Sequence, residues 1–179
     1  SLYIFLVLMV CNTSFAESLY SVLGIKLGDH VKNYKISKKP SPNTRKYSLN
    51  YMIKTKINNE YFKDEAYVDV DENYKIYNIL LFGAKKYKTS ECQEIKTTIF
   101  NLKKDKFIQA GFSGEYQKNK DGTYDSDNDY FRGIDVIFTK IKDNKEIKII
   151  FRSACDAAGK KGINAETDLW VYLRDAIVS

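Results

Sequence analysis

The sequence predicts an α+β domain in which an antiparallel sheet of about six to eight strands packs against one main helix, at about residues 90–108. Residues 46–83 and the chain after residue 112 form short runs in which apolar and polar residues alternate, the period of half-buried strands. Between them lies one stretch with apolar residues at helical spacing. Strands grouped on both sides of one helix favour an antiparallel sheet over a parallel α/β fold.

The chain opens with a segment typical of export. Residues 2–10 are uncharged and apolar, too few to span a bilayer, which takes roughly 20 residues, but within the range of about 7–15 for a signal peptide. Ser14 and Ala16 are small, as signal peptidase requires at these places. We therefore expect residues 1–16 to be an N-terminally truncated signal peptide and residues 17–179 to be a single domain. A buried N-terminal strand or helix is the alternative.

Cys11 gives a second interpretation of this segment, as the lipidated cysteine of a bacterial lipoprotein. The residue before such a cysteine is normally Gly, Ala or Ser, whereas here it is Val10. We therefore expect a protein exported to the periplasm or the extracellular space, with lipid anchoring through Cys11 as the alternative.

The first part of the exported domain contains short elements. Gly24 and Gly28 bracket a brief extended piece, and Asp29 can cap a short helix through residues 31–34. Residues 38–43 contain both prolines and must form a loop. The next part predicts a three-stranded meander that ends at Gly83, with strands at residues 47–57, 61–70 and 74–82.

One strong helix follows, for which Thr89 or Ser90 supplies an N-cap. Apolar residues spaced by three and four predict its core-facing stripe: Cys92, Ile95, Ile99 and Leu102. We expect Lys96, Lys103 and Lys104 to lie elsewhere on the helix surface. The chain then returns to strands at residues 112–116, 134–141, 146–151 and 168–173, with a hairpin turn at residues 142–145.

Two cysteines remain after the signal, Cys92 and Cys155, and an even number in an exported chain predicts a disulfide. Two buried free thiols are the alternative. A zinc site is less favoured, because His30 is the only histidine and no CxxC spacing occurs. We expect the bridge to be structural, with no cofactor.

The net charge of +6 belongs to the exported part, because the signal contains no charged residue. Lysines cluster at residues 35–39, 85–88, 103–106 and 160–161. An exported protein rarely meets nucleic acid, so these clusters favour an anionic membrane surface or another envelope protein as partner. A solvated, lysine-rich surface without a partner is the plainer alternative. The oligomeric state is left open.

The strongest candidate for a functional site in the sequence is a group of three aspartates. Asp125, Asp127 and Asp129 occupy positions one, three and five of a calcium-binding loop, whose oxygen ligands suit Ca²⁺. Position six is Tyr130 instead of glycine, and position twelve is Val136 instead of a bidentate glutamate. The pattern is therefore only a weak metal candidate, and a solvated hairpin loop is favoured.

No other residues indicate a catalytic centre. A serine or cysteine nucleophile needs a base, and nothing marks a nucleophile that folds beside His30, which we expect on the surface. Paired carboxylates support glycoside hydrolysis without histidine, but the acidic residues here occur in turns or on alternating strand faces. These residues are Glu60, Asp64, Glu65, Asp69 and Asp71.

The segment from Gly24 to Val31, with the sequence GIKLGDHV, resembles the start of small exported bacterial proteins of unknown function that have a GIxLG segment after the signal. It is also similar to the turn-then-helix opening of small lipoproteins of outer-membrane β-barrel assembly. The resemblance covers about ten residues. It implies a protein of the bacterial envelope and assigns no functional residue.

These observations predict a soluble periplasmic binding or accessory protein without catalytic activity, for example an enzyme inhibitor or an assembly factor. The exposed face of its antiparallel sheet would be the contact surface. The alternative is a hydrolase that uses carboxylates, with calcium assistance at Asp125, Asp127 and Asp129.

Overall fold

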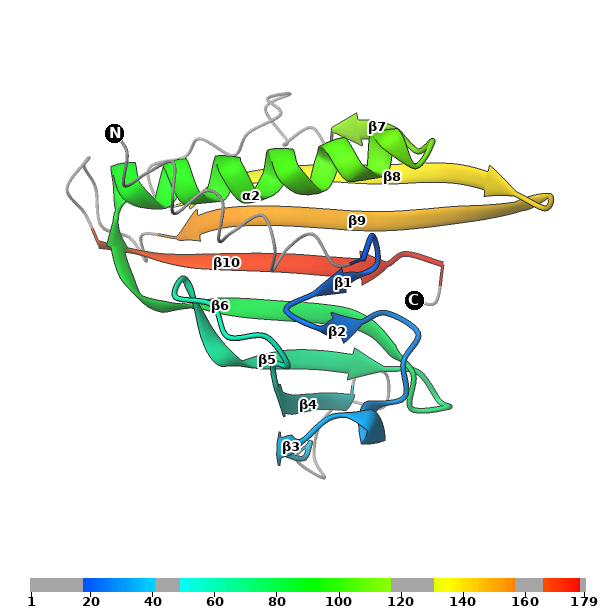
Figure 1. The fold of residues 1–179 in the computed structure, drawn as a ribbon, viewed down its shortest axis with the longest axis horizontal. Coiled ribbons are helices and arrows are strands. Elements are labelled where there is room, and N and C mark those ends of the chain that lie inside the picture. The colour runs from blue at the N-terminus through cyan, green and yellow to red at the C-terminus, as the bar shows by residue number, and fades with distance from the viewer. Residues whose placement is uncertain (1–17, 41–48, 117–130, 157–165, 178–179) are drawn as a thin grey trace.

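The computed structural model describes residues 18–40, 49–116, 131–156 and 166–177 of the chain. Eight strands form one antiparallel sheet in the order β3-β4-β5-β6-β10-β9-β8-β7, and one long helix packs against it (Figure 1). The predicted α+β class is therefore confirmed. In chain order the sheet strands are β3 (Ile36–Lys38), β4 (Leu49–Lys54), β5 (Phe62–Val70), β6 (Ile76–Lys88), β7 (Ser113–Tyr116), β8 (Phe131–Lys142), β9 (Lys145–Asp156) and β10 (Glu166–Asp175).

The helix α2 (Thr89–Gln109) and the N-terminal segment cover the same face of the sheet (Figure 1). The N-terminal segment, residues 18–34, contains a small hairpin of β1 (Ser21–Val22) and β2 (Ile25–Lys26), followed by a 3-10 helix, η1 (Val31–Asn33). Its apolar side chains, such as Leu23 and Ile25, belong to the same buried cluster as Ile99 of α2. One core therefore lies between the sheet and these two covering elements.

The strands show the alternation that their sequence predicts. In β10, Leu169, Val171 and Leu173 are completely buried and face the core, so Trp170 and Tyr172 point to the opposite face. The hairpin between β8 and β9 turns at Asp143 and Asn144, both with positive φ, as two-residue turns of this kind require.

Several strand ends and both helix caps differ from the prediction. The strand β6 continues past Gly83 to Lys88, because its second half pairs with β10, which is remote in sequence. The helix starts after Lys88 without a side-chain cap, so the cap expected from Thr89 or Ser90 is wrong. The short helix η1 is capped by His30 instead of Asp29, whose carboxylate accepts a hydrogen bond from Tyr34.

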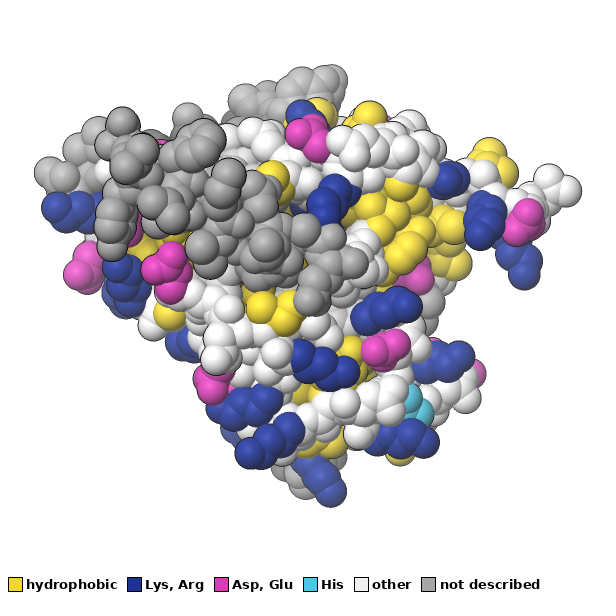
Figure 2. Space-filling model, in the orientation of Figure 1, with side chains coloured by type: hydrophobic (Ala, Val, Ile, Leu, Met, Phe, Trp, Pro, Cys, Tyr) yellow, Lys and Arg dark blue, Asp and Glu magenta, His cyan; other side chains and the backbone are white. Residues whose placement is uncertain are grey.

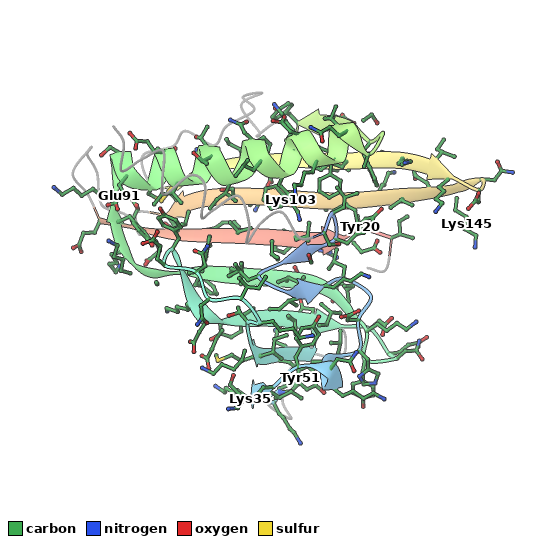
Figure 3. The ribbon with its side chains drawn as sticks, in the orientation of Figure 1. Tyr20, Lys35, Tyr51, Glu91, Lys103 and Lys145 are labelled. Atoms are coloured by element: carbon green, nitrogen blue, oxygen red, sulfur yellow. A yellow bond between two sulfur atoms is a disulfide. The ribbon has the colours of Figure 1, made fainter. Side chains whose placement is uncertain are left out.

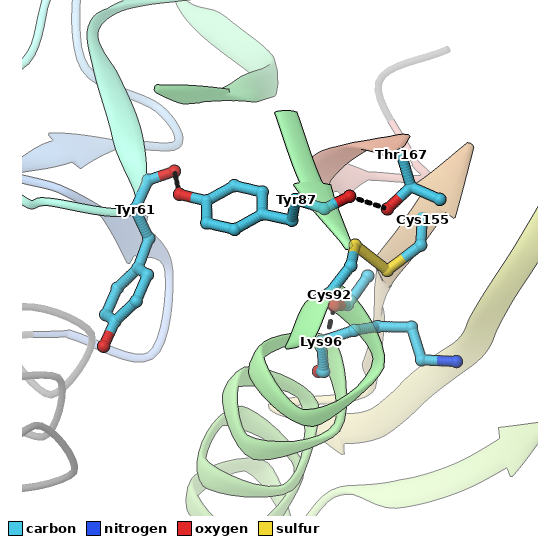
Figure 4. The surroundings of a disulfide bond; sticks show 7 residues. Tyr61, Tyr87, Cys92, Lys96, Cys155 and Thr167 are labelled. Carbon is cyan, nitrogen blue, oxygen red and sulfur yellow. Dashed lines mark hydrogen bonds between the residues drawn. A yellow bond between two sulfur atoms is a disulfide. The ribbon is translucent and has the colours of Figure 1, made fainter. Parts of the chain in front are cut away.

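A disulfide joins Cys92 and Cys155, the pair predicted from the sequence, across 63 residues of chain. It links the first turn of α2 to the end of β9 (Figure 4). Beside it, the Thr167 hydroxyl donates to the Tyr87 carbonyl, and the Tyr87 hydroxyl donates to the Tyr61 carbonyl. The bridge therefore fastens the helix where β6, β9 and β10 meet.

The buried stripe of the helix differs from the predicted one because it includes two lysines. Its residues are Thr89, Cys92, Lys96, Ile99, Phe100, Lys103 and Phe107. The Lys103 ammonium is fully buried and donates to the carbonyls of Ser18 and Ser21, at 2.8 and 2.7 Å. Lys103 therefore ties α2 to the N-terminal segment, near the point where Tyr20 packs against the helix (Figure 3). The expectation that Lys96 and Lys103 lie away from the core is wrong.

Candidate binding site

One face of the sheet is not covered by any helix or strand in the described part of the chain. The helix and the N-terminal segment both lie on the other face (Figure 1). The side chains of β10 that point away from the core, Trp170, Tyr172 and Arg174, are only partly buried. We call this surface the uncovered face.

The register of the strands places the side chains of the uncovered face in rows. One row crosses five strands from β5 to β8 and consists of Tyr67, Leu80, Tyr172, Arg152 and Asp135. The next row consists of Asp69, Asn78, Arg174, Ile150 and Ile137. In the first row the apolar and aromatic side chains lie on β5, β6 and β10 and the charged ones on β9 and β8, and in the second row this arrangement is reversed.

The centre of the uncovered face is a groove of about 960 Å³. Half of the side chains that line it are charged: Lys63, Asp135, Arg152, Asp156, Asp168 and Arg174. The other half are apolar or aromatic: Leu80, Phe82, Ile137, Ile150, Trp170 and Tyr172. A smaller hollow of about 430 Å³ continues the groove over β4 and β5, where Tyr67 packs edge-on against Phe82.

Arg152 is the central cation of the groove. Its guanidinium forms two parallel hydrogen bonds with the carboxylate of Asp135 on β8 and lies 5.6 Å from the ring centre of Trp170. The Asp135 side chain is only 16% exposed. Such a bidentate pair fixes the orientation of both side chains, so the ring face of Trp170 and the guanidinium over it form a rigid feature.

A second polar cluster lies at the other side of Tyr172. Arg174 donates to the Tyr172 hydroxyl at 3.3 Å and stacks on Tyr77, and Asn78 donates to Asp69 at 2.7 Å. Burial raises the pKa of the Asp69 carboxyl, and the hydrogen bond from Asn78 partly opposes this. One buried oxygen of Asp69 and the Arg174 Nε have no hydrogen-bond partner among the described groups. Such groups cost stability, so this cluster is not optimised for folding.

Two carboxylates face each other at the far end of the groove. Asp156 on β9 lies directly opposite Asp168 on β10, on the same face of the sheet. Lys86 partly offsets this repulsion, since its ammonium lies 3.3 Å from Asp168. Like charges directly opposite each other destabilise a sheet.

The candidate residues from the sequence are dispersed. Asp125, Asp127 and Asp129 lie outside the described residues. Within the described ranges, no three His, Cys, Asp or Glu side chains come together as a metal site would require. His30 lies at the surface of the N-terminal segment, where its Nδ1 accepts from the Lys32 amide and its ring stacks on Tyr74.

The other acidic candidates have separate local roles. Asp64 and Glu65 both pair with Lys54, and Asp71 accepts hydrogen bonds from the backbone of its own turn. Two of these residues, Glu65 and Asp69, lie on the uncovered face: Glu65 lines the smaller hollow, and Asp69 accepts a hydrogen bond from Asn78. The sequence signal for the groove was the alternation of Trp170, Tyr172 and Arg174 along the last strand, whereas Arg152, Asp135 and Asp156 carried no signal of their own.

None of the described helices is long and apolar enough to cross a membrane. Comparison with known proteins finds no matching family, no matching curated protein and no matching solved structure. The proposal for the function therefore rests on the residues of the groove and their geometry.

Proposed function

We propose that this chain is a non-catalytic binding protein of the bacterial envelope, which holds a polypeptide partner on the uncovered face of its sheet. The observation that carries the proposal is the groove centred on Trp170, Tyr172 and Arg152. Trp, Tyr and Arg are the residues that contribute most binding energy in protein interfaces, particularly where a polar rim surrounds them.

The charge pattern supports a polypeptide as the partner. The lining contains three cations, Lys63, Arg152 and Arg174, and three carboxylates, so the groove is balanced although the chain has a net charge of +6. A polypeptide offers amides, apolar side chains and both signs of charge, which such a mixed surface can match.

The framework of the site is rigid. Five hydrogen-bonded strands carry the groove, and the Cys92–Cys155 bridge fastens the helix behind them. A preorganised surface loses little conformational entropy on binding, which suits an inhibitor or an assembly factor better than a lidded enzyme. The disulfide is compatible with export to an oxidising compartment such as the periplasm.

Site-specific crosslinking in living cells tests this proposal. We expect a photoreactive amino acid at Tyr67, which is 41% exposed on the uncovered face, to capture a discrete protein. The same amino acid at Tyr74, 47% exposed on the N-terminal side of the molecule, is the matched control and should not capture it. Adding Trp170→Ala should reduce the Tyr67 adduct at least 30-fold, since such an anchor contributes about 2 kcal/mol or more.

Thermal unfolding of the Trp170→Ala variant should remain close to that of the wild type, because Trp170 lies outside the main core. Equal adducts at Tyr67 and Tyr74, or a Tyr67 adduct that survives Trp170→Ala, would show that the uncovered face is not the contact surface.

A carboxylate-dependent hydrolase is the second candidate, because Asp156 and Asp168 oppose each other in the groove. We expect Asp168→Asn to leave the Tyr67 crosslink intact and to change stability little, since it removes both the like-charge pair with Asp156 and the ion pair with Lys86. Hydrolysis of glycoside or ester substrates by the wild type, lost in Asp168→Asn, would favour the hydrolase. Calcium assistance would also require millimolar Ca²⁺ to stabilise the wild type but not Asp127→Ala.

A further inference from the structure

A second surface, independent of the uncovered face, carries half of the net charge of the chain. Seven exposed lysines lie on the N-terminal segment and on the strand ends and turns beside it (Figure 2). None forms an ion pair with another side chain in the described ranges. We call this set the basic surface: Lys26, Lys32, Lys35, Lys38, Lys39, Lys56 and Lys75.

Contacts around Tyr34 join one part of the basic surface. The Lys56 ammonium lies 4.2 Å from the centre of the Tyr34 ring, and the Tyr34 hydroxyl accepts from the Lys26 amide at 3.0 Å. Lys56 is also bonded through its amide to the carbonyl of Leu23 in the β1–β2 turn. Lysines thirty residues apart in the sequence therefore share one patch of surface.

Contacts around His30 join the other part. His30 pairs with Lys75 in an isolated β-bridge, and its Nδ1 accepts from the Lys32 amide. The His30 ring stacks on Tyr74, whose side chain is 47% exposed. The patch thus combines unpaired ammonium groups with one exposed aromatic side chain.

The acidic residues within four positions of these lysines are fewer: Asp29, Glu60, Asp71 and Glu72. Seven lysines against four carboxylates leave an excess of three positive charges, half of the net +6. Asp29 and Asp71 also accept hydrogen bonds from Tyr34 and from the turn backbone. The excess of positive charge favours an anionic partner.

We propose that the basic surface docks on an anionic lipid bilayer. Its cations are all lysines, which act as point charges and lack the planar fork with which arginine recognises a single carboxylate or phosphate. They are spread over several elements, an arrangement that fits a planar array of headgroups. Tyr74 has an apolar ring with a polar tip, the type of side chain that settles at the level of the headgroups.

Vesicle binding tests the proposal with the full chain. We expect the wild type to sediment at low salt with vesicles of phosphatidylcholine and phosphatidylglycerol, and added NaCl to release it. It should not bind vesicles of phosphatidylcholine alone. The variant Lys26→Gln/Lys32→Gln/Lys75→Gln should lower the partition coefficient by roughly 100-fold, about fivefold for each lysine.

The matched control is Lys142→Gln/Lys145→Gln/Lys148→Gln, which removes the same charge from the β8–β9 hairpin. Its partition coefficient should stay within a few-fold of the wild type. Equal losses in the two triple variants would show that only net charge matters and would overturn the proposal. The proposal would also be overturned if the wild type did not bind anionic vesicles. If it bound immobilised polyglutamate instead, the surface would fit an acidic polypeptide.

Discussion

Replacing both bridged cysteines, as Cys92→Ala/Cys155→Ala, is expected to lower the free energy of unfolding by about 4 kcal/mol. The bridge closes a loop of 63 residues, and removing it restores conformational freedom to the unfolded chain. Both side chains are buried, with exposures of 0% and 2%, so the folded state also loses packing between α2 and β9. For a domain of this size, the midpoint of thermal unfolding should fall by roughly 10 °C.

Urea unfolding of the oxidised wild type, the reduced wild type and the double variant measures this effect. The reduced wild type should resemble the variant, because both lack the same crosslink. Intact mass with and without reductant should differ by two protons in the native protein. A double variant as stable as the oxidised wild type would contradict the structural role of the bridge.

The second large effect concerns Lys103. Burial and, to a smaller extent, the neighbouring charge of Lys106 lower the pKa of its ammonium to about 7. The native protein therefore releases this proton near pH 7, whereas the unfolded chain keeps it up to about pH 10.4. Between these values the unfolded state binds more protons, so stability rises with pH, by up to about 1.4 kcal/mol per pH unit. Below pH 7 both states are protonated and the contribution of Lys103 stays at its lowest.

By urea unfolding, the free energy of unfolding of the wild type should be about 2 kcal/mol higher at pH 9 than at pH 7 because of this group. The Lys103→Met variant should not show this increase. Tyr34 does not titrate in this window, because burial raises its pKa to about 12. Lys104→Met, one position along the helix and only partly buried, should keep the slope of the wild type. A slope that persists in Lys103→Met would contradict the assignment.

The sheet could be predicted because its signal is local. Leu169, Val171 and Leu173 alternate with polar or aromatic neighbours, and burial of one face requires that period. The cysteine pair could also be predicted, since the two cysteines that remain after the predicted signal peptide allow a single bridge. The first prediction needs only the requirement that apolar side chains leave water, and the second needs only the number of cysteines in an exported chain.

The buried stripe of the helix could not be predicted in the same way. Lysine at positions 96 and 103 is typical of a solvated helix face, and only tertiary packing makes it a core residue. For Lys103 the cause is the N-terminal segment, which brings the carbonyls of Ser18 and Ser21 against the helix from more than eighty residues away. Carbonyls buried at such a contact need a donor, and a long flexible side chain reaches them.

The groove lies between these cases. The pattern of the last strand places Trp170 and Tyr172 on the face opposite the core, but it does not identify their neighbours. Arg152 and Phe82 reach them from β9 and β6, and this depends on the strand order. Strand order is set by pairings between distant segments, for which the sequence has no local marker.

The position of β10 has a consequence for how the chain acquires its structure. β10 is the last described strand, yet it occupies the middle of the sheet between β6 and β9. Until it has been synthesised, the meander of β4, β5 and β6 and the hairpin of β8 and β9 have no shared partner, so the two halves cannot close one core. Folding is therefore dominated by non-local pairing and completes only once β10 is available. A chain that stays open until β10 has emerged can still pass through a translocation channel, as the proposed export requires.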